Sequence, residues 1–293
     1  YFQGTNEDSV IHYTNKVKEF AKATHQPKYY YFAWANRLIT YYLKTSRTNI
    51  ALYEVQNMLK EAQEEDDKTG LSRCYNIMSQ IYTIKRFDSM AFEWRLKEIE
   101  LTEKYKIENY NISQTYAQIA NYYINQKKQK EALAAVEKAI ATANSSTQQI
   151  SAKLEFVNYY SKFGDFQAAE KLLKECQAAF EQDKRLESIK KRLYNIECLY
   201  YQQTKQYQKA LEAAKMQEKE ERRLSESILS SIHYRTQGEI YQKMGNINLA
   251  VKYLQMYINT DDSLKIANEQ VASSEFATLL NVEKLNAEKK ELM

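Results

Sequence analysis

Amide side chains recur through this sequence in a pattern that could bind a peptide. An asparagine lies in each of five successive segments of the chain, and in the second segment a glutamine follows it after four residues. A sixth segment has an arginine and a glutamate at the corresponding places. Residues four apart share one face of a helix, and an amide offers both a donor and an acceptor to an extended peptide backbone. These candidate partner-binding residues are Asn36, Asn76, Gln80, Asn121, Asn158, Asn195, Arg235 and Glu239.

Two roles are open for each of these amides. They could line a groove that holds a protein or peptide partner, or they could bridge adjacent helices inside the protein. For a single residue the two roles are equally open, whereas the regular set favours a polar ladder along a groove.

Other patterns that carry chemistry point away from catalysis. The run from Glu64 to Asp67, with Thr69 and Gly70 close behind it, is typical of a solvated loop rather than of an acid and base pair. Glycine-rich phosphate loops, nucleophile elbows and paired cysteine motifs are missing from the sequence. The histidines lie far apart and without metal-ligand spacing, and the cysteines are odd in number, which favours simple packing roles. We therefore expect no enzyme activity, no metal and no cofactor. These residues are His12, His25, His233, Cys74, Cys176 and Cys198.

Composition narrows the class of protein further. A single proline and five glycines among 293 residues leave long helices uninterrupted, and 27% charged with 44% hydrophobic residues is ordinary for a helical protein. The net charge is +4 and the basic clusters are small, so we expect no contact with nucleic acid. No run reaches the ~18 apolar residues that a membrane-spanning helix needs.

A repeated pair of residues predicts the helices on which these amides lie. Six tyrosines recur every 37 to 41 residues, and an alanine follows each tyrosine after nine residues. A period near 40 without strand signals predicts stacked helix pairs, with the tyrosine late in a first helix and the alanine early in a second. A small side chain there lets two helices approach closely. The pairs are Tyr42 and Ala51, Tyr82 and Ala91, Tyr123 and Ala132, Tyr160 and Ala169, Tyr201 and Ala210, and Tyr241 and Ala250.

The last of these segments resembles the tetratricopeptide repeat. Tyr234, Gly238, Tyr241, Gly245 and Ala250 stand at the spacings of that family's pattern. The resemblance implies an all-α solenoid, a right-handed superhelix of about six helix pairs over residues 28–262, whose concave groove binds a protein or peptide. The lysine and asparagine clamp of chaperone-binding members is not reproduced.

The first two repeats and most of the turns depart from this pattern. The first two repeats fit loosely, because Ile39 and Ser79 stand where a small residue is expected and Arg95 where an apolar one is. Glycine is expected to end the first helix in the left-handed conformation at Gly164 and Gly245, whereas the other turns lack glycine.

The N-terminal residues fall into two parts. Residues 1–4 match the end of an engineered protease-recognition linker and are not expected to belong to the natural protein. Residues 5–27 predict a helix that is either a cap or the remnant of a preceding repeat. The expected buried face of this helix holds Val10, Val17, Phe20 and Ala21.

Residues 263–293 predict a long capping and connector helix. Its first half is expected to cover the sixth repeat through Ala267, Val271 and Phe276. Leu264, Val271, Thr278, Leu285 and Leu292 recur at intervals of seven, a weak coiled-coil seam that allows a homodimer.

This C-terminal helix is similar to the one in bacterial tetratricopeptide-repeat regulators, where it leads into a histidine kinase of a two-component system or a helix-turn-helix domain. The resemblance implies a sensor or input region in signal transduction or transcription regulation, with an output module after Met293. The compartment would be periplasmic for a membrane-anchored sensor and cytoplasmic otherwise. A free-standing scaffold or adaptor without signalling output remains the alternative.

Overall fold

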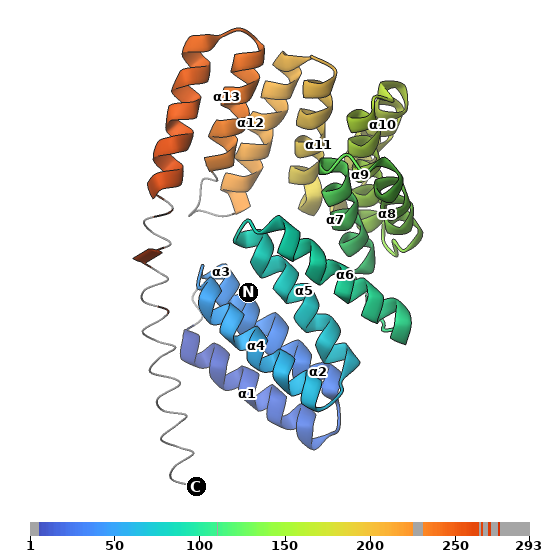
Figure 1. Cartoon of the computed structure of the whole chain (residues 1–293), viewed down its shortest axis with the longest axis vertical. Coiled ribbons are helices and arrows are strands. Elements are labelled where there is room, and N and C mark those ends of the chain that lie inside the picture. Colours follow the sequence, from blue (N-terminus) through green and yellow to red (C-terminus); the bar gives the residue numbers. More distant parts are fainter. Residues whose placement is uncertain are drawn as a thin grey trace. The chain divides into compact units, whose positions relative to one another are not determined.

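The computed structural model is helical throughout the part of the chain that it describes, namely residues 6–109, 111–224, 231–263, 265, 269, 270 and 275 (Figure 1). The helices group into two compact units. Unit one comprises residues within Tyr1–Asn109 and Ile266–Met293, and unit two comprises residues within Tyr110–Lys265.

Both units are built from helix pairs, as the repeat predicts, and the all-α solenoid fold is confirmed. In unit one, the helices are α1 (Glu7–Ala23), α2 (Pro27–Ala33), the π-helix η1 (Trp34–Ile39), α3 (Thr40–Lys44), α4 (Thr48–Glu64), α5 (Lys68–Ile84) and α6 (Asp88–Tyr105). In unit two, they are α7 (Ile112–Asn125), α8 (Gln129–Ala141), α9 (Ser146–Phe163), α10 (Phe166–Gln182), the 3-10 helix η2 (Lys184–Ile189), α11 (Lys190–Gln203), α12 (Tyr207–Leu224), α13 (Ser231–Lys243) and a final helix at residues 247–263.

The repeated tyrosine marks the joint between the two helices of each pair. Its backbone carbonyl accepts a hydrogen bond of 2.8 to 2.9 Å from the backbone N–H five residues later in all six repeats, as between Tyr160 and Asp165. This is the 6→1 bond of the Schellman motif, which requires a left-handed residue just before the donor. Gly164 and Gly245 fill that position as predicted, whereas Ser46, Arg86, Lys127 and Lys205 adopt the same left-handed φ without being glycine.

The repeated alanine lies where the second helix makes its first closed turn. Five of the six alanines have no exposed surface, and Ala250 is 3% exposed. Each backbone N–H bonds to the residue four positions earlier, as between Ala169 and Asp165 at 3.0 Å. The predicted role in close helix packing is therefore confirmed.

The acidic run forms the turn between α4 and α5 from Glu65 to Asp67, as expected, whereas the loop does not extend to Thr69 and Gly70. Glu64 is the last residue of α4, Asp67 caps α5 by accepting from the N–H of Gly70, and Thr69 and Gly70 lie inside α5. The glycine serves close packing instead of a turn. A Cβ built on Gly70 would stand 2.8 Å from the ring of the fully buried Tyr31.

The loose fit of the first two repeats has a local cause in each. The first repeat contains η1, a π-helix, and a π-turn accommodates an extra residue relative to an α-helix, so the small position shifts. In the second repeat Arg95 is 8% exposed, and its Nη2 donates to Oγ1 of Thr83 at 2.7 Å. A buried arginine that is hydrogen-bonded thus replaces the expected apolar residue.

The N-terminal helix α1 packs on α2 and η1. Val10 and Ala21 are buried in this contact as expected, but Phe20 is 69% exposed, so its expected place on the packed face is wrong. The cap expected from Ala267, Val271 and Phe276, and the seam through Leu285, lie outside the described residues. Within the described helices, none combines the length and the apolar character needed to cross a membrane.

Candidate peptide-binding surface

The first helices of unit two form a packed row. Helix α9 contacts both α7 and α11, whereas the second helices α8 and α10 pack mainly on first helices. The first helices of this unit are thus in direct contact with one another along the stack. The predicted amides of this unit lie on these helices.

A buried carboxylate connects this row. The Oε1 atom of Glu155, on α9, accepts from the Nδ2 of Asn121 on α7 at 3.1 Å and from the Nδ2 of Asn158 on its own helix at 2.8 Å. Its Oε2 atom accepts from Nη2 of Arg192 on α11 at 2.8 Å. Because Glu155 is 2% exposed and three first helices donate to it, this contact fixes their relative positions.

A similar contact occurs in unit one. Both carboxylate oxygens of Glu98, on α6, accept from the Nδ2 of Asn76 on α5, at 3.1 and 3.2 Å, and Asn109 donates to the same group at 2.9 Å. The Oδ1 of Asn76 accepts from Gln80 at 2.6 Å. Asn76 is therefore engaged at both ends of its amide, in the bridging arrangement that the sequence left open.

Other members of the predicted set face solvent. Asn195 on α11 is exposed, and within the described residues its side chain makes no hydrogen bond. Arg235 and Glu239 on α13 form an ion pair of 2.9 Å with each other on the surface. The set thus divides into amides that hold helices together and polar side chains that a partner can reach.

The first member of the set lies in an unusual backbone. Asn36 is exposed within the π-helix η1, and Nη1 of Arg73 on α5 approaches its Oδ1 at 3.4 Å. Arg73 also stacks on the ring of Phe32, 5.5 Å from its centroid, and burial lowers its pKa. Asn36 thus presents an exposed amide in a type of backbone that occurs frequently at functional sites.

Sequence reasoning missed the two buried glutamates. In the sequence, Glu98 and Glu155 look like ordinary surface charges. Their burial is indicated only by their positions, because each lies on a helix that packs against an asparagine of the predicted ladder and accepts a hydrogen bond from it. A buried carboxylate is retained only with such partners.

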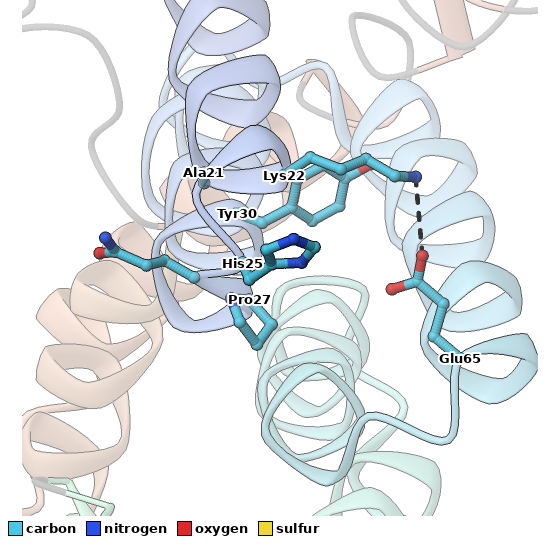
Figure 2. Close-up of a pocket in the computed structure, with 7 residues that line it drawn as sticks. Ala21, Lys22, His25, Pro27, Tyr30 and Glu65 are labelled. Atoms are coloured by element: carbon cyan, nitrogen blue, oxygen red, sulfur yellow. Dashed lines mark ion pairs between the residues drawn. The ribbon is translucent and has the colours of Figure 1, made fainter.

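A cavity of about 310 Å³ opens beside the turn between α1 and α2 (Figure 2). Figure 2 shows Lys22 reaching over Tyr30 toward Glu65, with which it forms an ion pair of 3.6 Å. The hydroxyl of Tyr30 donates to Glu61 at 2.6 Å, and burial together with this carboxylate raises the pKa of Tyr30. His25 and Gln26 line the same cavity.

The cysteines of the described chain are buried thiols. Burial raises the pKa of Cys74 to about 12 and that of Cys176 to about 11, so neither is a reactive thiolate near neutral pH. Among the described residues, no group of three or more His, Cys, Asp or Glu is arranged to hold a metal.

Solved structures with a similar fold include a tetratricopeptide repeat protein. The crystal structure of NprR in complex with its cognate peptide NprX matches with a TM-score of 0.61 and 15% identity, over 89% of this chain and 73% of that chain. A tetratricopeptide repeat protein from Parabacteroides merdae matches with a TM-score of 0.53 and 12% identity, over 92% of this chain and 98% of that one. Neither the protein-family models nor the curated proteins give a match.

Proposed function

We propose that this chain is a non-catalytic module that binds an extended peptide or protein segment along its first helices. The observation that carries the proposal is the row of α7, α9 and α11 joined by Glu155. The row is rigid because buried charge-assisted hydrogen bonds hold it. A preorganised surface loses little conformational entropy when a partner binds.

The contacts with a partner come from the exposed polar residues of these helices. Asn195 lies three residues after Arg192 on α11, so both share the face that reaches Glu155. Its amide is exposed and can both donate to and accept from a peptide backbone. Asn36 and Gln80 offer equivalent groups on unit one. NprR, a protein of similar fold, binds a peptide, which supports the same class of ligand here.

Peptides selected from a random displayed library against the wild-type protein test this proposal. We expect Asn195→Ala to weaken the binding of such a peptide by at least about fivefold, because an amide that pairs with the backbone is lost. The melting temperature should stay unchanged, since Asn195 is exposed. Calorimetric titration measures the affinity.

The matched control is Lys171→Ala on α10, an exposed residue on a second helix. This variant should bind the selected peptide as the wild-type protein does. Equal affinity of the two variants for every selected peptide would place the binding surface elsewhere.

We further propose that the module is the input region of a bacterial signalling or transcription-regulatory protein, as the predicted connector helix suggests. The alternative is a scaffold protein that assembles partners without signalling output. The coding sequence that follows Met293 distinguishes the two: a kinase or helix-turn-helix domain supports the input role, and a stop codon supports the scaffold. A homodimer through residues 263–293 belongs to the same proposal.

A further inference from the structure

Helix α4 takes its N-terminal cap from a residue far away in the sequence. Its own N-cap residue, Arg47, makes no side-chain hydrogen bond to the helix. Instead, the backbone N–H groups of Asn49 and Ile50 donate to Oε1 of Glu275 at 3.1 and 3.3 Å. These N–H groups have no partner within the helix. By contrast, α5 and α10 are capped by the residues directly before them, Asp67 and Asp165.

The carboxylate of Glu275 is held by a complete set of donors. Its Oε2 accepts from the Nδ2 of Asn49 at 2.7 Å, and the Oδ1 of the same amide accepts from Nζ of Lys85 at 2.7 Å. Lys85 therefore orients the amide toward Glu275 and adds positive charge to that of the helix N-terminus. Glu275 is 3% exposed. Such a contact is a specific site for a carboxylate and more than a surface ion pair.

We propose that Glu275 is a detachable clasp on the N-terminus of α4. The clasp consists of side-chain contacts that can open, whereas the caps of α5 and α10 belong to the residues directly before those helices. Where the proposed input role holds, opening of this clasp is the conformational change that a downstream module would sense.

Hydrogen exchange followed by mass spectrometry tests the clasp on the whole chain without any peptide, so its failure is distinct from failure of the proposed function. We expect Glu275→Ala to speed exchange at the amides of Asn49 and Ile50 by about tenfold, the effect of a lost N-cap. Exchange at residues 269, 270 and 275 should rise with it. The control is Gln270→Ala, an exposed residue close to Glu275 in the sequence, which should leave both regions as in the wild type.

A second variant separates release of the clasp from damage to α4. Asn49→Asp places a second carboxylate beside Glu275, and the two negative charges repel each other. Once Glu275 has left, the new aspartate supplies the negative charge that stabilises the N-terminus of α4. We expect faster exchange at residues 269, 270 and 275 with α4 still protected, and circular dichroism equal to that of the wild type. Wild-type exchange at residues 269, 270 and 275 in Asn49→Asp, or equal exchange in the two alanine variants, would overturn the proposal.

Discussion

At the scale of single residues, buried charged and amide groups connect neighbouring helices. Glu155 has a side chain that is 3% exposed, and it forms an ion pair with Arg192, whose side chain is 27% exposed. Removal of Glu155 leaves the partly buried Arg192 without its ion-pair partner and only partly hydrated. The cost of such a loss exceeds the net contribution of the intact pair.

We predict that Glu155→Ala lowers the free energy of unfolding by about 2 to 4 kcal/mol, somewhat less than for fully buried pairs because Arg192 is partly exposed. Glu155→Gln keeps an acceptor for the asparagines and should lose about half as much. Urea denaturation followed by circular dichroism measures both values.

A surface pair on the neighbouring helices supplies the comparison. Lys153 and Glu175 lie 3.7 Å apart with side chains 40% and 49% exposed. Glu175→Ala should change stability by no more than about 1 kcal/mol. An equal loss in Glu155→Ala and Glu175→Ala would contradict the structural role given to Glu155.

At the scale of elements, the joints between helices carry backbone strain in a predictable place. Lys127 and Lys205 have φ values of 56° and 60°, in the left-handed region that glycine adopts without a steric cost. Gly164 occupies the same position in another repeat, with φ of 92°. The strain at the lysines is thus a property of the repeat and not of one turn.

Replacement of Lys127 by glycine should therefore stabilise the protein, by about 0.5 to 1 kcal/mol after the greater freedom of glycine in the unfolded chain is included. Gly164→Ala should destabilise it by about 1 kcal/mol for the reverse reason. Thermal unfolding of both variants gives the two values.

A glycine placed inside a helix controls for the substitution itself. Glu137 is exposed within α8, and Glu137→Gly should cost about 1 kcal/mol. A loss of similar size in Lys127→Gly would mean that the left-handed backbone there carries no strain.

The sequence predicts these elements well because local rules determine them. The tyrosine and alanine positions follow from helix period and turn geometry within about ten residues, and the structure confirms them. Contacts between residues far apart in the sequence cannot be predicted from such local rules. Nothing near Glu275 indicates that it caps α4, since the two are 225 to 226 residues apart. The buried state of Glu98 and Glu155 likewise depends on partners from other helices, so their charge alone suggests the opposite.

At the scale of the whole molecule, stability is expected to be a sum of neighbouring contacts. In a stack of helix pairs each pair touches only those beside it. A local disturbance should consequently stay local.

Ala169→Leu tests this expectation, because Ala169 has no exposed surface on α10. The larger side chain should cost about 1 to 3 kcal/mol by overpacking. We predict faster hydrogen exchange in α9, α10 and α11, with exchange in α5 of unit one unchanged. Lys171→Leu, on the exposed face of the same helix, is the control. Faster exchange throughout both units would indicate one cooperative structure.

The hydrogen bond that the carbonyl of the repeated tyrosine accepts also determines how such a chain can be altered. Both groups in this bond belong to the backbone, so the joint does not depend on which side chains surround it. Four residues other than glycine already occupy its left-handed position. Cutting the chain at equivalent joints should therefore yield interchangeable cassettes, whose order could be permuted or whose number could be increased by grafting. Buried carboxylates such as Glu155 limit such grafts. Each buried glutamate needs hydrogen-bond donors from a neighbouring helix pair, so a grafted cassette must be placed beside a pair that supplies them.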